Sequence, residues 1–338
     1  MSMRIDSFPA RLRRVALHLL AIIVLSIRSA VSQGLYEDSL SHEVTLPSTG
    51  DTLIAFMSDT QAPIFLESLF LRANHNEEAT RLILANILAS RPRAIIHLGD
   101  IVSIGSIPSS WEEFDAFCDT ARSLHIPIYP ALGNHELMLF PSVGLKRLRE
   151  RFPWFSETGY MVRVGRVAIL ILNSNISRLS KEQRRAQKQW LEHTLALLDA
   201  DSSVCAVILA CHHPPFTNST IVDPSAEVES LFVPLFLRDP KCRLFLSGHS
   251  HACEHFRTGG KDFLVIGGGG GLQHALLTGN EQRSKDLFPR NTTTRMFHYL
   301  QCKITATQLV LTVRMLRDDM SSFEDAYRFA IPIDVTVR

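Results

Sequence analysis

Residues 127–136 read PIYPALGNHE, so an extended apolar run ends at Gly133 and an amide, an imidazole and a carboxylate follow at once. Four other stretches place a metal-binding side chain beside a glycine or at the end of an apolar run. They are Asp59-Thr60-Gln61, Gly99-Asp100, His212-His213-Pro214 and Gly248-His249-Ser250-His251. In open α/β folds, ligand sites form at the carboxyl ends of strands, so we expect these side chains to converge at one edge.

The converging side chains are carboxylates, one amide and imidazoles. This mixture suits borderline or harder metals such as manganese, iron or zinc. The candidates are Asp59, Asp100, Asn134, His212, His249 and His251. Together with a histidine acid they supply the ligands for two adjacent metal ions. The sequence therefore predicts metal-dependent hydrolysis of a phosphate ester, with a small phosphoester or a nucleotide as substrate.

Strand and helix signals alternate from residue 51 onward, and no composition break marks a second domain. Apolar runs predict strands at 53–57, 94–98, 204–210, 244–246 and 263–266, and Gly165-Arg166 predicts a hairpin between 160–164 and 167–172. Helical spacing predicts helices at 77–90, 111–124 and 226–237, the last interrupted by Pro234. A capping box at Ser180–Gln183 opens another helix to about Leu198. Three strands are expected after Arg295, at 296–302, 308–313 and 329–337. The simplest architecture is two packed sheets with helices on the outside.

The composition excludes one class of function. The 338 residues are 46% hydrophobic, which is enough for a substantial buried core, and the formal net charge is +1. Acidic and basic residues are interspersed, so the chain lacks the basic stripe of a dedicated nucleic-acid binder. A nucleotide substrate stays open.

The N-terminus has the pattern of a secretory signal. Four arginines precede an almost wholly apolar run at residues 15–27, and small residues at Ala30 and Ser32 suit cleavage after Ser32. An uncleaved membrane anchor is the alternative, although the run is short for a membrane span. We expect a secreted or extracytoplasmic protein with a signal peptide or anchor at 1–32, a linker at 33–50 and one domain at 51–338.

Export would place the six cysteines in an oxidising compartment. Three of them stand in or beside apolar runs and are expected in the core. The other three, Cys118, Cys253 and Cys302, could pair, and the sequence leaves their connectivity open. Glycosylation sequons, which matter only in a eukaryotic secretory route, occur at Asn175, Asn218 and Asn291.

The ordered motif set resembles the calcineurin-like metallophosphoesterase superfamily, in the branch that also holds purple acid phosphatases and cyclic-nucleotide phosphodiesterases. The resemblance covers roughly residues 50–270, and the GD, GNHE and GHSH motifs are specific as a set. It implies an α/β fold, a four-layer α/β/β/α sandwich of two mixed sheets flanked by helices. It also implies a dinuclear metal site at the strand ends.

The same resemblance implies a role for each candidate. Asp59 and His251 would bind the first metal, and Asp100 would bridge both. The second metal would be bound by Asn134, His212 and His249. His135 would not bind metal but would face the leaving-group oxygen.

These implied roles agree with the chemistry. A carboxylate shared by two cations reduces their repulsion and holds them about 3.5–4 Å apart. A water between them loses a proton near neutral pH, and the metal-bridging hydroxide is a nucleophile. His135 could then protonate the departing alkoxide, a step worth about 10²–10⁴-fold in rate. From adjacency alone, Glu136 is a candidate to orient the His135 ring, with another acceptor as the alternative.

One position departs from the family pattern. The usual Asp-x-His is here Asp59-Thr60-Gln61, and the neutral amide of Gln61 is a weaker ligand than imidazole. Purple acid phosphatases also lack that histidine, but they have a tyrosine three residues after the bridging aspartate, where this chain has Ser103. The first metal site is therefore expected to be weak, metal-selective or filled only with substrate. The alternative function is a catalytically impaired metal-binding or scaffold protein on the same fold.

Further residues are candidates for the substrate pocket. His213 follows a ligand candidate and, with Asn134, is a candidate to contact the phosphate. Loops 60–76 and 137–158 are expected to frame the pocket, with Arg72 and Asn74 near the substrate and Phe65, Phe70 and Phe140 at the mouth. The glycine run Gly267–Gly271 is interpreted as a turn that approaches the site closely, because no Lys-Ser/Thr follows it as in a phosphate-binding loop. Monoester and diester substrates both stay open.

Overall fold

The computed structural model describes residues 43–47, 50–64, 71, 74–290, 292–295 and 297–333. The segment expected to be a signal peptide or anchor, residues 1–32, lies outside these ranges, as do Phe65, Phe70 and Arg72. Within the described ranges, no helix combines the length and the apolar character that crossing a bilayer requires.

One mixed sheet has seven strands in the order β1-β5-β6-β7-β8-β10-β9. Strands β6, β7 and β8 run parallel at its centre and are almost wholly buried, because both faces of this part of the sheet are covered. The strands are β1 (Glu43–Leu46), β5 (Tyr160–Val164), β6 (Val167–Ile171), β7 (Ala206–Ala210), β8 (Cys242–Ser247), β9 (Cys253–Thr258) and β10 (Lys261–Ile266).

The second mixed sheet has six strands in the order β13-β12-β11-β2-β3-β4. Strands β2, β3 and β4 are parallel, and β11, β12 and β13 extend the sheet as an antiparallel meander. The strands are β2 (Thr52–Met57), β3 (Ala94–His97), β4 (Ile128–Pro130), β11 (His298–Ile304), β12 (Gln308–Leu316) and β13 (Phe323–Pro332).

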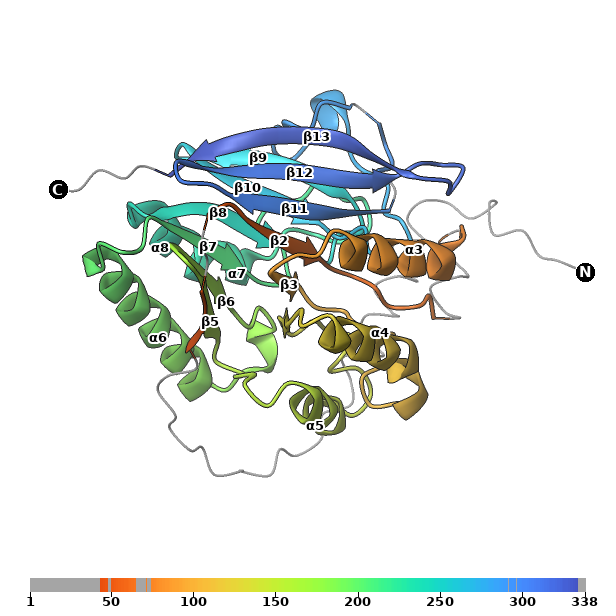
Figure 1. Ribbon diagram of the computed structural model, residues 1–338, viewed down its shortest axis with the longest axis horizontal. Coiled ribbons are helices and arrows are strands. Elements are labelled where there is room, and N and C mark those ends of the chain that lie inside the picture. Colours follow the sequence, from red (N-terminus) through yellow and green to blue (C-terminus); the bar gives the residue numbers. More distant parts are fainter. Residues whose placement is uncertain are drawn as a thin grey trace, which may run out of the picture. The chain divides into compact units, whose positions relative to one another are not determined.

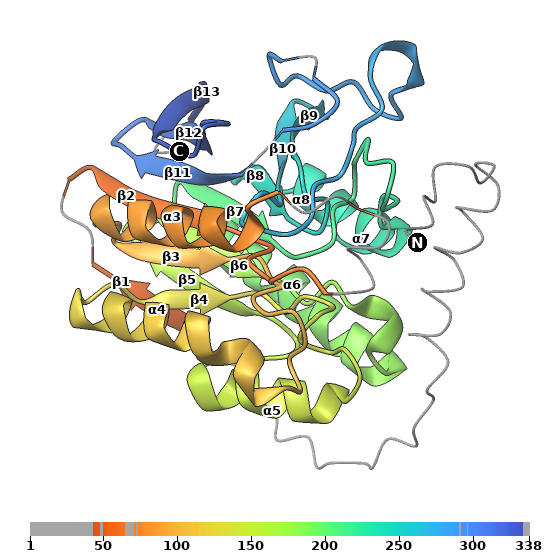
Figure 2. The same ribbon diagram turned by 90° about the vertical axis from the view of Figure 1, so that its right-hand side faces the viewer.

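Helices cover the outer face of each sheet, which gives four layers (Figures 1 and 2). Helices α3 and α4 pack with the two inner sheet faces in one hydrophobic core, and α6, α7 and α8 form a second core on the seven-stranded sheet. The helices are α3 (Asn76–Ala89), α4 (Glu112–Ser123), α5 (Pro141–Arg151), α6 (Lys181–Ala200), α7 (Ala226–Leu231) and α8 (Val233–Arg238), with short 3-10 turns η2 (Pro108–Trp111), η3 (Ile176–Arg178) and η4 (Gly279–Glu281). The predicted sandwich of two mixed sheets flanked by helices is confirmed.

Most predicted elements are present within two or three residues of their expected ends. The β5–β6 hairpin is antiparallel around Gly165-Arg166 as predicted. The capping box at the start of α6 is also present, because Ser180 Oγ accepts from the Gln183 backbone and Gln183 Oε1 accepts from the Ser180 backbone. Both structures are formed by residues that are close in the sequence, so the sequence alone could predict them.

The interruption of the helix at 226–237 is confirmed, because α7 and α8 are separate helices and Pro234 has no backbone N–H to continue the first. Three expectations need correction. The predicted linker at 33–50 contains strand β1, which pairs with β5. The expected loop at 137–158 contains α5, which begins at Pro141. The last strand lies six residues earlier than predicted, at Phe323 rather than Phe329.

The structure bears on the open cysteine and glycosylation questions. All six cysteines are free, so Cys118, Cys253 and Cys302 form no disulfide among them. Two sequons are inside the protein, because the amide of Asn175 donates to Leu132 O and that of Asn218 to Ser284 O, both from buried positions. The third, at Asn291, lies outside the described residues.

Candidate metal centre

The five polar turns follow the carboxyl ends of parallel strands, as predicted. Those after β2, β3 and β4 belong to one sheet, and those after β7 and β8 belong to the other. Three of the predicted ligands have left-handed backbone, with φ of 59° at Asp59, 54° at Asp100 and 64° at His249. Such φ values are unfavourable for residues other than glycine and cluster at functional sites.

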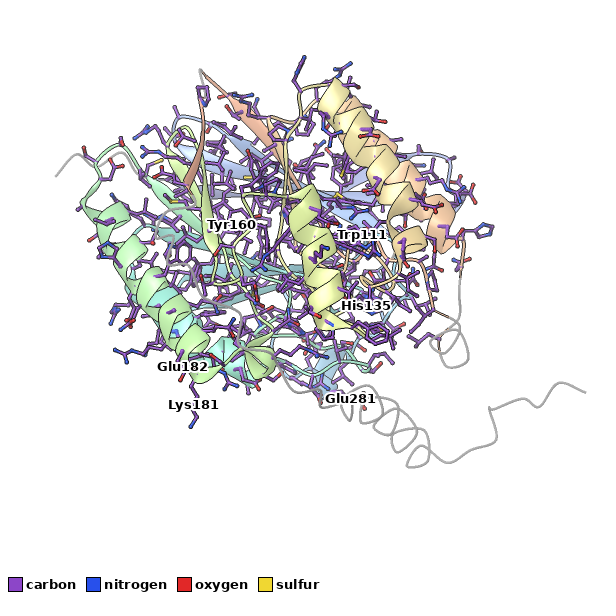
Figure 3. All side chains as sticks on the ribbon, turned by 90° about the horizontal axis from the view of Figure 1, so that it is seen from below. Trp111, His135, Tyr160, Lys181, Glu182 and Glu281 are labelled. Atoms are coloured by element: carbon purple, nitrogen blue, oxygen red, sulfur yellow. The ribbon has the colours of Figure 1, made fainter. Side chains whose placement is uncertain are left out.

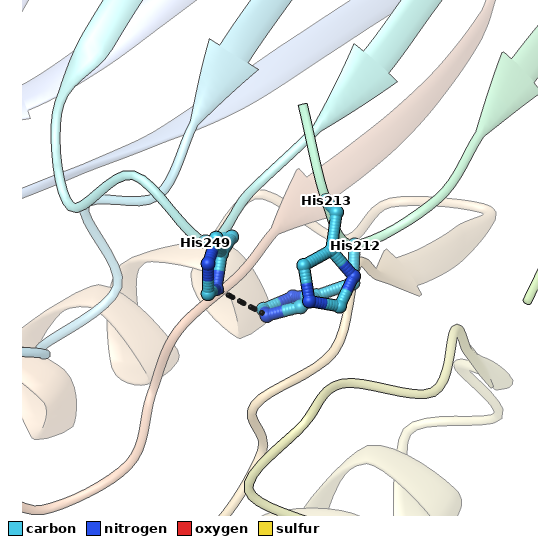
Figure 4. A group of neighbouring side chains, drawn as sticks. All are labelled: His212, His213 and His249. Atoms are coloured by element: carbon cyan, nitrogen blue, oxygen red, sulfur yellow. Dashed lines mark hydrogen bonds between the residues drawn. The ribbon is translucent and has the colours of Figure 1, made fainter. Parts of the chain in front are cut away.

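Three predicted ligands of the second metal surround a nitrogen atom of the fourth, His212. His212 Nε2 lies 3.1 Å from Asp100 Oδ2, 3.1 Å from Asn134 Oδ1 and 3.2 Å from His249 Nδ1. Figure 4 shows the last of these contacts, with the rings of His212 and His249 turned toward each other. These atoms carry lone pairs, and a single proton on Nε2 could satisfy only one of the three contacts. A cation between them would satisfy all four atoms.

The other ring nitrogen fixes the tautomer of His212. Nδ1 lies 3.0 Å from the carbonyl oxygen of Leu98, which can only accept, so Nδ1 carries the proton and Nε2 presents its lone pair. Burial, the largest single effect, opposes a charged imidazole. The charge of Asp100, its hydrogen bond and the charges of Asp59 and Glu136 together outweigh burial and raise the pKa of His212 to about 9. The carboxylate thus draws positive charge to this position, and a metal ion can supply that charge.

The predicted first-metal ligands form a neighbouring group. The Asp59 carboxylate accepts from the His249 backbone at 2.9 and 3.1 Å and lies 3.4 Å from His251 Nε2. Gln61 Nε2 lies 3.1 Å from the same imidazole nitrogen, and Gln61 Oε1 is a buried oxygen without a hydrogen-bond partner. His251 Nδ1 lies 2.5 Å from Leu272 O, which again leaves Nε2 as the ligand atom. The orphaned amide oxygen fits a cation beside Asp59 and His251.

The two groups adjoin. Asp59, Asp100 and His212 each offer a ligand atom, and these atoms lie within 4.8 Å of one another; so do ligand atoms of His212, His213 and His249. Asp100, placed between the groups, has a pKa well below its usual value. Burial raises this pKa, but the charges of His212, His135 and His249 and the hydrogen bond from His212 together outweigh burial. The donor set and its spacing fit bound metal, and the structure brings the predicted ligands together at one edge: Asp59, Gln61, Asp100, Asn134, His212, His249 and His251.

His135 lies at the same edge but differs from the ligands. Its Nδ1 is 2.7 Å from Ser103 O, and its Nε2 is 3.8 Å from Asp100 Oδ2. Its backbone N–H donates to Asp100 Oδ1 at 2.8 Å. In Figure 3, His135 lies beside the end of α5. Its Nε2 therefore faces the metal centre without being one of the close ligand atoms.

Of the two alternatives for orienting the His135 ring, the structure shows another acceptor, Ser103 O, and not Glu136. The buried Glu136 carboxylate instead accepts from four backbone N–H groups, at 2.7 to 3.3 Å, which belong to Gly133, Asp100, Ile101 and Val102. Burial is the main reason that the pKa of Glu136 is raised to about 7, and the Asp100 charge adds to it. Glu136 thus joins the turn after β3 to the turn after β4.

The remaining candidates have mixed outcomes. His213 lies at the centre, with its ring 4.5 Å from that of His249 and its Nδ1 2.8 Å from Ser174 Oγ. The backbone N–H of Asn74 donates to Asn76 Oδ1, and its contact with substrate stays a prediction. Phe140 is 65% exposed, in keeping with a position at the pocket mouth.

The glycine run does approach the site closely. A Cβ at Gly271 would lie 2.4 Å from the His251 ring, and one at Gly267 would lie 3.0 Å from Asp59 Oδ2. Backbone N–H groups of the run donate to Ser58 O and Asp59 O, which supports the strained ligand turn. Sequence reasoning missed His274, whose ring stacks on His251 at 4.3 Å and whose Nδ1 accepts from the His251 backbone. A lone histidine 23 residues away carries no signal for that contact.

The family model described as calcineurin-like phosphoesterase matches residues 52–253. A curated relative, a probable glycerophosphodiester phosphodiesterase GpdQ from Arcobacter nitrofigilis, is 31% identical over 137 residues. That match covers 38% of this chain and 45% of the relative, so the chain spans less than half the length of the curated protein that it matches.

Solved structures share the fold at low sequence identity. The purple acid phosphatase PPD1 from yellow lupin seeds has a TM-score of 0.59 at 16% identity, over 84% of this chain and 54% of that one. A dimetal phosphatase from Danio rerio has a TM-score of 0.57 at 14% identity, and the match covers 85% of this chain and 100% of that one. GAP50, described as the anchor in the inner membrane complex of Plasmodium, has a TM-score of 0.60 at 14% identity. That match covers 85% of this chain and 90% of the other.

Proposed function

The chain belongs to the calcineurin-like phosphoesterase family, and we propose that it hydrolyses a small phosphate ester with two metal ions bound in this centre. The observation that carries the proposal is the crowding of lone pairs at His212 Nε2, which has a carboxylate, an amide and an imidazole within 3.2 Å. Hydrogen bonds alone leave this arrangement unsatisfied, whereas a divalent cation is its natural partner.

The residues divide into two ligand groups with a shared carboxylate. Asp59, Gln61 and His251 would hold the first ion, and Asn134, His212 and His249 would hold the second, with Asp100 contacting both. When bound, the ions supply an activated water as nucleophile and positive charge for the phosphoryl oxygens. Manganese, iron and zinc all suit this donor set.

His135 is proposed as the general acid. Its Nδ1–H is held by Ser103 O, so a protonated ring carries its transferable proton on Nε2, on the side of Asp100. The Asp100 carboxylate lies 3.8 Å from Nε2, so the transferable proton would face the metal centre. His213, beside His249 and fixed by Ser174, is proposed to contact the phosphate.

The substrate is proposed to be a small phosphoester or a nucleotide. The name of the curated relative favours a diester, and the purple acid phosphatase among the structural neighbours shares only the fold. A panel of monoesters, diesters and nucleotides distinguishes the two ester classes.

The test combines elemental analysis with turnover. We expect two ions per chain after loading with manganese or iron, and phosphate release from an aryl phosphate or diester. Asp100→Ala and His249→Ala should each abolish turnover, whereas His193→Ala, at an exposed position of α6, should retain it. Undiminished turnover in both site variants would refute the proposal. Two tightly held ions without activity on any ester would instead favour the scaffold function that Gln61 motivates.

We also propose export of the protein, which rests on the pattern of residues 1–32. Expression of the full chain in a secreting host should yield a mature protein that begins at Gln33. An intact N-terminus in the membrane fraction would show that the segment is an anchor.

A further inference from the structure

An exposed apolar patch borders the metal centre. Among the described residues, only five large hydrophobic side chains are exposed. Four of them come from the residue before η2, the turn before α5 and the first turn of α5. These four form what we call the apolar lip: Ile107 (36% exposed), Leu139 (49%), Phe140 (65%) and Val143 (39%). The fifth, Leu197, stands on α6.

Hydrogen bonds and close packing bring the two halves of the lip together. Ser106 Oγ donates to Met138 O at 3.4 Å, and Arg147 Nε on α5 donates to Ser106 O at 3.3 Å. Gly144 lies so close to the catalytic turn that a Cβ there would be 1.8 Å from Glu136 O and 3.3 Å from the Gly105 carbonyl carbon. Ile107 therefore lies on the same rim as the first turn of α5.

The lip is held in place rather than loosely exposed. Leu139 has φ of 62°, and the backbone N–H of Phe140 donates to Met138 O at 2.8 Å across it. This is the strained form of the γ-turn, which is rare for a bulky residue. On the other side, buried Trp111 donates its indole N–H to Gly105 O at 2.9 Å. The backbone under both halves is thus fixed.

Both halves are also tied to the proposed acid. The carbonyl oxygen of His135 accepts from Gly105 N at 3.0 Å and from Met138 N at 3.2 Å. The lip thus begins within two residues of these contacts with the backbone of the proposed acid. Exposed apolar patches of this kind mark sites where an apolar partner binds.

We propose that the lip binds an apolar leaving group, so that the substrate is a phosphate ester of an alcohol with an alkyl chain or an aryl ring. This inference rests on the proposed phosphoesterase function and specifies its substrate class. A phosphate held at the metal centre would place the first carbons of the alcohol next to His135 and the following carbons over Phe140 and Val143.

The experiment measures chain-length dependence in two ways. The binding of n-alkylphosphonates, from methyl to octyl, to the manganese-loaded full chain is followed by calorimetry, and the hydrolysis of n-alkyl phosphates and n-alkyl phosphodiesters is followed in parallel. Full burial of a methylene would strengthen binding about fourfold. The lip is open on one side, so we expect about twofold for each methylene, which gives about 100-fold between methyl and octyl. Phe140→Ser/Val143→Ser should reduce the octyl-to-methyl ratio to less than about tenfold.

Leu197→Ser is the matched control, because it removes an exposed leucine of α6 and should keep the wild-type ratio. A flat series in the wild-type protein, or an unchanged ratio in the double variant, would overturn the inference while the phosphoesterase function stands. No binding and no turnover at any length, methyl included, would overturn that function as well. A flat series together with lip-dependent binding to phosphatidylserine vesicles would reassign the lip to membrane docking.

Discussion

The Nδ1 atom of His135 lies 2.7 Å from the carbonyl oxygen of Ser103. A carbonyl can only accept, so this contact fixes the proton on Nδ1 and aims Nε2 at the metal centre. Ser103 stands where purple acid phosphatases, by the resemblance noted above, have a tyrosine. The chain uses the backbone of this residue, rather than its side chain, to position the proposed acid.

The first prediction concerns that acid. His135→Gln should lower kcat by about 10²–10⁴-fold, because the amide cannot protonate the leaving oxygen. The loss should be larger for an alkyl ester than for a nitrophenyl ester, since nitrophenolate departs without a proton. Metal content should stay at the wild-type value, because His135 is not among the close ligand atoms. Equal losses on both esters would show that His135 positions the substrate instead.

The second prediction concerns Glu254, a buried carboxyl that accepts from Thr217 Oγ1 at 2.6 Å and from the Asn218 backbone at 2.7 Å. Burial is the main cause that raises the pKa of Glu254 from 4.5 to about 7. The folded protein therefore binds this proton more tightly than the unfolded chain. The resulting stability is present below pH 4.5 and is lost as the pH rises through 7, and it amounts to roughly 3 kcal/mol.

Glu254→Gln removes this titration and keeps the side-chain size. The free energy of unfolding of the wild-type protein, relative to the variant, should fall by roughly 3 kcal/mol between pH 4.5 and pH 8. Urea unfolding of both proteins at equal metal concentration measures this difference. If the free energies of unfolding of the two proteins differ by the same amount at every pH in that range, Glu254 does not titrate as stated.

The ligand turns were predictable because their signals are local. Asp59 and Asp100 each follow a short apolar run, and parallel strands bring their ends to one edge whatever the intervening loops do. The order of the motifs then identified the family. The fold followed from the same alternation of strand and helix signals.

The polar residues whose roles sequence reasoning missed are buried by tertiary contacts. Strand β9 carries Glu254 and His255, whose burial is possible only because Thr217 and Asp262 pair with them. The role of Glu136 is equally invisible, since three of its four donors lie more than 30 residues earlier. Periodicity cannot show a polar residue that is buried by partners.

The third prediction concerns the close approach of Gly271 to His251. Gly271→Ala would place a Cβ 2.4 to 2.8 Å from three atoms of the His251 ring, so the ring must move. We expect metal content to fall from two ions to about one per chain, with the first site lost. Gly268→Ala is the control, because its Cβ meets the ring of His298, which is not a ligand, at 2.1 to 2.8 Å. The same loss of metal in both variants would indicate general unfolding.

The last prediction restores the ligand that the family pattern has at position 61. Gln61 is buried beside His251, and its Oε1 has no hydrogen-bond partner, so an imidazole there would meet the same cation. Imidazole is a stronger ligand than an amide oxygen for zinc, iron and manganese, so Gln61→His should tighten the first metal by about tenfold or more. Metal titration with elemental analysis measures the affinity, and Gln61→Ala should weaken it. An affinity that is the same in all three proteins would show that residue 61 does not bind metal, and the first ion would then depend on Asp59 and His251 with the shared Asp100.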